Sequence, residues 1–374
     1  MNGEKSKAAT VNPVSWQAHY SDVSVNEAAV FEPDEIYALP DTEKVAFLNW
    51  FHAPHNQSLA PHQRLAKYLE KTLHGFTYNG STHNATEAAI LDNGNCLSLA
   101  VITAALASVA DIDLKFQKMN SPPVYKKQGD IMMLSSHVRT KAYNTVNKEG
   151  RDDGSFPKVL VPASVIIDYF PSYGNVKGEY VSQDAVSAMF YRNKVAVALV
   201  DNHVSKAFWL ADKALKLAPN DPENVSAMAV VLRRLDKQDE AEQLYQQAIA
   251  HDITDITLLS NYLSLLSRQG REQEAAEVGE LLLHQNDENP YSWITLASEH
   301  IDRRELKKAQ YFLDKAKQLA PYLDDVYREQ ARCFFLQEKL DEAHQALTKA
   351  HQLAWDDRSR ALYMAKQTAL ESLR

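Results

Sequence analysis

Apolar and small side chains in the second half of the chain recur with one constant period. The first series is spaced by 34 residues and comprises Ala207, Ala241, Ala275, Ala309 and Ala343. A second series follows seven residues later and comprises Ala214, Ala248, Leu282, Ala316 and Ala350. Two small positions seven residues apart lie on one face of a helix and let a neighbouring helix approach closely. The pattern therefore predicts repeated pairs of helices.

Bulky side chains mark the first helix of each predicted pair, at Tyr191, Val225, Leu259, Trp293 and Tyr327. Pro219 and Pro321 follow the second helix in two of the pairs, where proline ends a helix. These features resemble the tetratricopeptide repeat, in five copies over residues 188–357. The resemblance implies an all-α solenoid with a concave face that takes a protein or peptide partner. Residues 358–374 are predicted to form a capping helix whose apolar side carries Ala361, Leu362, Ala365 and Leu370.

The first half of the chain changes from helical to alternating patterns. Residues 1–30 have few apolar anchors and are predicted to be a mobile tail ahead of a domain over residues 31–185. Helical spacing predicts helices over 41–53 and 61–76, and a period of two predicts strands over 114–119, 130–144 and 159–170. The second and third strands are expected to pair antiparallel. Two glycines and a proline within 171–180 predict the connection to the repeats, with the boundary between residues 171 and 190.

The segment DNGNCLSLA at residues 92–100 predicts where a long apolar helix begins. Gly94 suits a turn and Asn95 is a good N-cap, so the helix over 97–109 should begin at or beside Cys96. A helix N-terminus favours a thiolate, and its backbone N–H groups can hold an oxyanion. The alternative is that Cys96 is a small apolar residue at the start of a buried helix. Cys333, in the fifth repeat, is expected to be a buried structural thiol.

A histidine and an aspartate follow in the predicted strands. His137 lies in the second strand and Asp168 in the third, so adjacent strands bring imidazole and carboxylate within reach if both share a sheet face. This order of Cys, His and Asp resembles the transglutaminase-like superfamily over about residues 86–173, especially its bacterial members with tetratricopeptide repeats after the catalytic domain. The resemblance implies an α+β transglutaminase-like (papain-like) domain, with Cys96 as nucleophile, His137 as general base and acid, and Asp168 orienting His137.

Acyl transfer by such a site also needs hydrogen-bond donors for a tetrahedral oxyanion. The backbone N–H of Cys96 is one candidate. Asn95 and Gln117 are both candidates for the second donor, and the sequence does not decide between them.

Composition argues against several other functions. A net charge of −9 and a pI near 5.8 disfavour a nucleic-acid groove as the main site. The chain has only two cysteines, so no disulfide framework is expected. The sequence contains neither a Gly-x-Gly-x-x-Gly motif nor a phosphate-loop motif, so a nucleotide cofactor is not expected. His52, His55 and His62 have spacings that can bind a metal, but no carboxylate-rich motif accompanies them, and neither a metal nor another cofactor is expected.

The opening MNGEKSKAATVNPVSW lacks the apolar core of a secretory signal, and no stretch is long and apolar enough to span a bilayer. A cytoplasmic or periplasmic location is expected. The main hypothesis is a Cys-His-Asp thiol enzyme acting on an amide or acyl bond, as a peptidase, amidase or acyl transferase working through a thioester. Its repeat solenoid would bind a protein or peptide. The alternative is a catalytically inactive protein-binding scaffold with the same fold.

Overall fold

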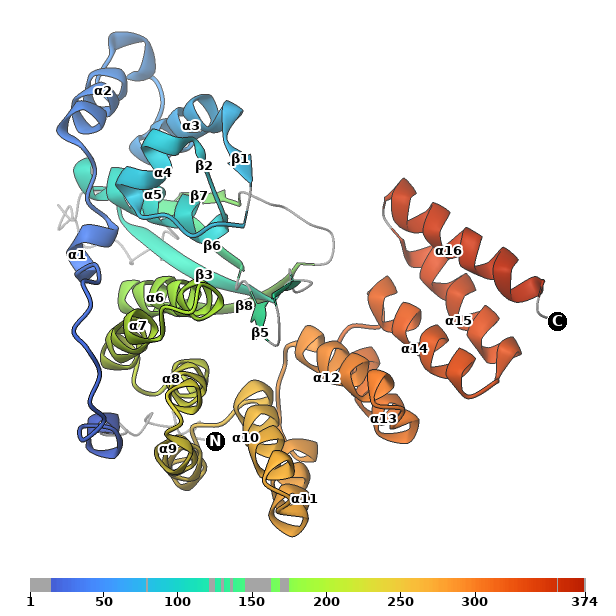
Figure 1. The fold of residues 1–374 in the computed structure, drawn as a ribbon. Helices are drawn as coiled ribbons and strands as arrows, with labels where there is room; N and C mark the ends of the chain where they lie inside the picture. The colour runs from blue at the N-terminus through green and yellow to red at the C-terminus, as the bar shows by residue number, and fades with distance from the viewer. Residues whose placement is uncertain are drawn as a thin grey trace, which may run out of the picture. The chain divides into compact units, whose positions relative to one another are not determined.

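A computed structural model describes residues 15–78, 80–120, 125–128, 131–134, 137–144, 163–168, 175–354 and 356–372. The chain divides into two units, one made of residues 1–30 and 187–284 and the other of residues 31–186 and 285–374. Figure 1 labels the helices and strands of both units.

Five α-helices precede the main sheet: α1 (Pro33–Ile36), α2 (Asp41–Phe51), α3 (Pro61–Thr72), α4 (Ala85–Leu91) and α5 (Cys96–Val109). Every residue of α5 from Cys96 to Ala107 is buried. A helix that is apolar on all sides belongs in a core, and α5 contacts α2, α3, α4 and the main sheet. The helices expected over 41–53, 61–76 and 97–109 are confirmed, whereas α4 was not predicted.

The main sheet has four antiparallel strands in the order β7-β6-β3-β8. These are β3 (Leu114–Asn120), β6 (His137–Tyr143), β7 (Ser164–Ile167) and β8 (Val176–Val181). The predicted antiparallel pair is present as β6 and β7, with Thr140 opposite Ile167. The single strand predicted over 130–144 is two strands instead, because Ile131–Leu134 (β5) pairs with β4 (Tyr125–Gln128) in a separate sheet.

Part of the predicted connection between the domains is an edge strand. Residues 176–180 belong to β8, while residues 171–174 lie outside the described residues. A Cβ added to Gly178 would lie 2.7 Å from the carbonyl oxygen of Lys118, where β3 shifts register between Gln117 and Met119. Gly178 is therefore needed for the close approach of two strands rather than for a flexible linker.

Ten helices follow in consecutive pairs through the repeat region. They are α6 (Gln183–Val200), α7 (Val204–Leu217), α8 (Pro222–Arg234), α9 (Gln238–Ala250), α10 (Ile256–Arg268), α11 (Glu272–Leu283), α12 (Pro290–Asp302), α13 (Leu306–Leu319), α14 (Asp324–Leu336) and α15 (Leu340–Leu353). Both series of small residues spaced by 34 positions are buried throughout. The prediction of repeated helix pairs is confirmed.

The capping helix α16 (Asp357–Glu371) is present, but its buried side differs from the prediction. Tyr363 and Leu370 are buried, whereas Leu362 is 47% exposed. The Tyr363 hydroxyl donates to Asp324 Oδ2 at 2.7 Å, so its ring is buried while its polar end is satisfied. The prediction is therefore confirmed for Leu370, while Tyr363 takes the buried place expected for Leu362.

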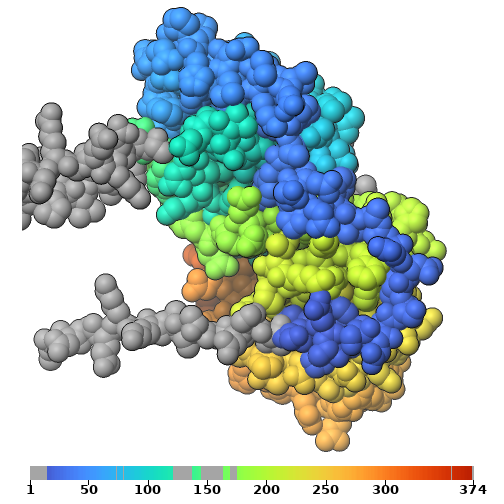
Figure 2. Space-filling model, turned by 90° about the vertical axis from the view of Figure 1, so that its left-hand side faces the viewer, coloured from blue at the N-terminus to red at the C-terminus, as the bar shows by residue number. Residues whose placement is uncertain are grey.

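Residues 15–30 pack on the first repeats, so the prediction of a mobile tail is wrong for these residues. Trp16 is 2% exposed and donates from Nε1 to the Pro219 carbonyl at 2.6 Å. Tyr20 donates to Asp212 Oδ1 of α7 at 3.1 Å, and the indole of Trp209 donates to the Asn26 carbonyl at 3.0 Å. Figure 2 shows this segment in dark blue along the repeat surface. Aromatic anchors thus fix a segment that includes one short 3-10 helix, Trp16–His19.

Candidate active site

The start of α5 is built by the residues directly before Cys96. The side chain of Asn95 accepts a hydrogen bond from the Ser98 backbone N–H at 3.0 Å, which is the expected N-cap. Gly94 has a φ of 152°, and a Cβ there would lie 2.7 Å from Ser98 Oγ. The backbone therefore requires glycine at this position, and Cys96 occupies the first position of the helix.

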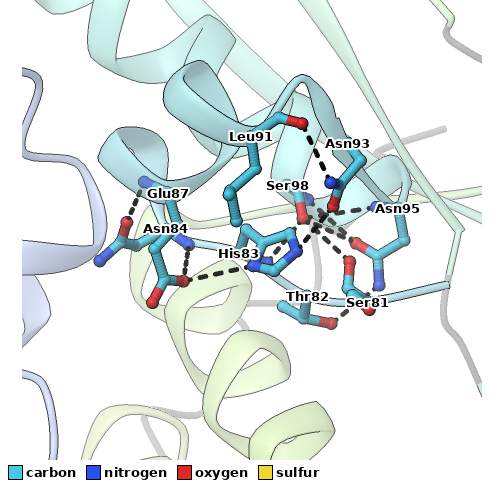
Figure 3. Close-up of polar contacts among 9 residues, drawn as sticks. All are labelled: Ser81, Thr82, His83, Asn84, Glu87, Leu91, Asn93, Asn95 and Ser98. Atoms are coloured by element: carbon cyan, nitrogen blue, oxygen red, sulfur yellow. Dashed lines mark hydrogen bonds and ion pairs between the residues drawn. The ribbon is translucent and has the colours of Figure 1, made fainter. Parts of the chain in front are cut away.

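Polar side chains hold the preceding loop against this helix start (Figure 3). The hydroxyl of Ser98 accepts from the His83 backbone N–H at 2.8 Å and lies 3.3 Å from the Ser81 carbonyl, to which it donates. Asn95 Nδ2 donates to Thr82 Oγ1 at 2.8 Å. Asn95 and Ser98, which form the N-cap of α5, thus also bind residues 81–83. These hydrogen bonds fix the position of Cys96.

The ring of His83 joins this network to α4. His83 Nε2 lies 2.9 Å from Asn93 Oδ1, and His83 Nδ1 lies 3.4 Å from Glu87 Oε2. Glu87 and Asn84 form a capping box, in which the Glu87 backbone N–H donates to Asn84 Oδ1 at 2.7 Å. The Asn-x-x-Glu spacing was the sequence signal that could have identified α4.

The structure brings together the three residues of the predicted catalytic group. His137 Nε2 lies 3.2 Å from Asp168 Oδ1, and the His137 ring also forms a hydrogen bond with the Cys96 side chain. Because Nε2 faces Asp168, Nδ1 is the ring nitrogen left for the thiol. His137 begins β6 and Asp168 directly follows β7, so the antiparallel pairing of the two strands produces this contact.

The environment of His137 favours its charged form. Burial by itself lowers the pKa of an imidazole. The hydrogen bonds and charges of Asp168 and Cys96 outweigh this effect and raise the pKa of His137 to about 9. At neutral pH the ring is therefore an imidazolium that can donate to both neighbours.

Cys96 is more deeply covered than its place at a helix start suggested, because it is only 2% exposed. Tyr78, in the short strand β1 (Thr77–Tyr78), pairs with Gly94 in β2 (Asn93–Gly94). Burial and then the charge on Cys96 raise the pKa of the Tyr78 hydroxyl to about 12, so the phenol lies within electrostatic reach of the thiol. A two-residue strand has no periodic signal, which is why the sequence did not identify Tyr78.

Both candidates for the second oxyanion donor make other hydrogen bonds. Gln117 Nε2 donates to the Gly178 carbonyl at 2.9 Å, and its Oε1 accepts from Arg139 Nε at 3.0 Å. Asn95 caps α5 and donates to Thr82, as described above. Their amides are thus held by the protein on both sides.

The histidines with possible metal spacing do not form a site. His62 is 3% exposed, whereas His52 and His55 are exposed. Within the described residues, no group of three or more His, Cys, Asp or Glu side chains is placed to hold a metal ion. Among those residues, too, no helix has the length and apolar character needed to cross a membrane.

No protein-family model matches the chain, and no similar curated protein is found. Among solved structures, YrrB, described as a tetratricopeptide-repeat protein with an unusual peptide-binding site, is 17% identical, with a TM-score of 0.30 over 48% of this chain and 92% of YrrB. PilF from Pseudomonas aeruginosa is 19% identical, with a TM-score of 0.33 over 51% of this chain and 90% of PilF. MamA from Desulfovibrio magneticus is 17% identical, with a TM-score of 0.30 over 44% of this chain and 94% of that fragment. Scores this low define no function, and the repeat assignment rests on the buried 34-residue series described above.

Proposed function

We propose that the protein is a Cys-His-Asp thiol enzyme that acts on an amide or acyl bond, with a transglutaminase-like domain over residues 31–185. The observation that carries the proposal is the position of His137, which contacts Cys96 with one side and Asp168 with the other. A nucleophile, a base and an orienting carboxylate in this order are the groups that acyl transfer requires.

The proposed reaction begins from a Cys96 thiolate beside the protonated His137 ring, a pair in which the thiol proton has already passed to the imidazole. The Cys96 thiolate attacks the carbonyl carbon of the substrate, and the negative charge moves to the carbonyl oxygen, where the backbone N–H of Cys96 stabilises it. As the bond to the leaving amine breaks, His137 gives the amine its proton and a thioester remains. Water or a second amine then attacks the thioester, gives a proton to His137 and releases Cys96.

The raised pKa of His137 supports its role as the acid in this sequence. A ring that is protonated at neutral pH has a proton ready for the leaving amine. Asp168 accepts from Nε2 and so keeps Nδ1 directed at the thiol. The proton therefore moves at the nitrogen nearest the reacting bond.

The repeat region is a scaffold of paired helices, and we propose that it binds a protein or peptide for the first domain to act on. Such arrays of stacked repeats present an extended concave surface. Residues on that surface would set which partner is bound, while the chemistry would stay with Cys96.

A catalytically inactive scaffold is the second candidate, and the burial of Cys96 favours it. A thiol that is 2% exposed must be uncovered before a substrate carbonyl reaches it. In that case the Cys96–His137 contact would serve only to stabilise the domain.

Selective labelling of the two cysteines separates these candidates. Cys333 is buried, its Sγ lies 3.5 Å from the Leu306 carbonyl, and burial raises its pKa, so it should react slowly. We expect brief iodoacetamide treatment of the native protein to label Cys96 in preference to Cys333, as read by peptide mass spectrometry. His137→Ala should remove most of the Cys96 labelling, while Cys333 serves as the internal control. Equal and slow labelling of both cysteines would favour the inactive scaffold.

A further inference from the structure

A row of polar side chains crosses three strands of the main sheet beside His137. In the pairing of β3 with β6, Gln117 stands opposite Arg139. In the pairing of β6 with β7, Thr140 stands opposite Ile167, so Arg139 and Asp168 occupy the next pair of positions. Alternation along β6 places Arg139 on the same side as His137. Register alone therefore assembles Gln117, Arg139 and Asp168 in one line.

Two hydrogen bonds and one longer ion pair connect the side chains of the row. Arg139 Nε and Nη2 donate to Gln117 Oε1 at 3.0 and 2.8 Å, and Gln117 in turn is fixed by the Gly178 carbonyl. Arg139 Nη1 lies 3.9 Å from Asp168 Oδ2, with the two side chains 13% and 15% exposed. His137 uses the other oxygen, Oδ1. One carboxylate is thus shared between an imidazole and a guanidinium.

The charges of the site balance only when Arg139 is counted. After proton transfer, Cys96 and Asp168 are negative, and His137 and Arg139 are positive. Without the guanidinium, the same half-buried group would carry one net negative charge, which disfavours the thiolate. The titratable groups against His137 are Cys96 of α5 and Asp168 after β7, and Tyr78 of β1 lies near Cys96. Arg139 adds a positive charge to this group through its ion pair with Asp168.

We propose that Arg139 is a positioning residue for the proposed reaction, which forms an ion pair with Asp168 across 3.9 Å and supplies the charge that balances the Cys96–His137 pair. This inference rests on the proposed function. Gln117 supports Arg139 in this role, because its side-chain oxygen accepts two hydrogen bonds from the guanidinium. It is therefore a positioning residue and not the second oxyanion donor.

The test compares Arg139→Met, Arg139→Lys and the control Lys141→Met, which removes a charge two residues further along β6. The readouts are the rate of Cys96 alkylation against pH, the pKa of His137 by NMR, and the thermal midpoint. For Arg139→Met we expect the alkylation midpoint to rise by about one pH unit, which slows the reaction at neutral pH by about tenfold. The pKa of His137 should also rise, because Asp168 then acts on the imidazolium alone. Arg139→Lys should lie between the parent and Arg139→Met, and Lys141→Met should match the parent.

Two results would overturn the inference. One is a pH midpoint of Cys96 alkylation in Arg139→Met that equals the midpoint of the parent. This result would leave Arg139 a purely structural role, even if the variant unfolds at a lower temperature. The other is a fall in the pKa of His137. Failure of the proposed function gives a different pattern. Cys96 of His137→Ala then reacts at the same rate as Cys96 of the parent, while Arg139→Met still changes the pKa of His137 measured by NMR.

Discussion

At the scale of single residues, the site depends on a competition at His137. Burial opposes the charged ring, and the contacts with Asp168 and Cys96 outweigh it, so the pKa of His137 reaches about 9. The sequence identified these three groups because their order along the chain is distinctive. It did not predict the contacts of Tyr78 and Arg139, because these depend on strand register and on a two-residue pairing that leave no local pattern.

This raised pKa predicts a dependence of stability on pH. The ordinary pKa of histidine is 6.5 and the folded value is about 9, so the folded state binds the proton more tightly than the unfolded state. The resulting stabilisation is fully present below pH 6.5 and is lost as the pH rises through 9. We expect the difference in thermal midpoint between the parent and His137→Gln to be largest near pH 6 and to shrink by pH 9.5. A difference that stays constant over this range would contradict the raised pKa.

At the scale of elements, the start of α5 was the part that the sequence predicted best. The Gly94–Asn95–Cys96 turn uses rules that act over a few residues, a positive φ and an N-cap. Strand β8 was missed because Gly178 interrupts its alternation, and the need for that glycine arises from the neighbouring strand. The inward face of α16 was misjudged because the hydrogen bond from Tyr363 to Asp324 joins residues far apart in the chain.

The turn before Cys96 is predicted to be intolerant of a methyl group. In Gly94→Ala the new Cβ would lie 2.7 Å from Ser98 Oγ, and the φ of 152° suits only glycine. We expect a loss of about 1 to 3 kcal/mol of stability together with slower labelling of Cys96. Gly75→Ala is the matched control, because a Cβ there meets nothing within 4 Å. Equal unfolding midpoints for the two variants in urea would show that the turn is not strained in this way.

At the scale of the whole molecule, the chain enters the unit that contains the first repeats twice. Residues 15–30 pack on the first repeats, residues 31–186 belong to the other unit, and the chain returns to the repeats at residue 187. The 34-residue period predicted the repeats because it is sustained over five copies. It could not place residues 15–30, because the buried residues Trp16, Tyr20 and Val23 lie outside the 34-residue series.

The packed N-terminal segment makes Trp16 important for the stability of the repeats. Removing this buried indole in Trp16→Ala should cost about 3 to 5 kcal/mol, the usual range for a buried tryptophan. Asp22→Ala, at an exposed position of the same segment, should change stability by less than about 0.5 kcal/mol. Calorimetric unfolding of both variants measures the difference. If Trp16→Ala unfolds like the parent, residues 15–30 do not belong to the folded repeat unit.

Activation of Cys96 by His137 and Asp168 is measured by the rate of Cys96 alkylation as a function of pH. The parent, His137→Ala and Asp168→Asn are compared, with folding checked by circular dichroism. We expect the parent to react at lower pH than either variant, and both variants to react at neutral pH about tenfold or more slowly than the parent. Superimposable profiles for the three folded proteins would contradict this activation and leave Cys96 a structural residue of α5.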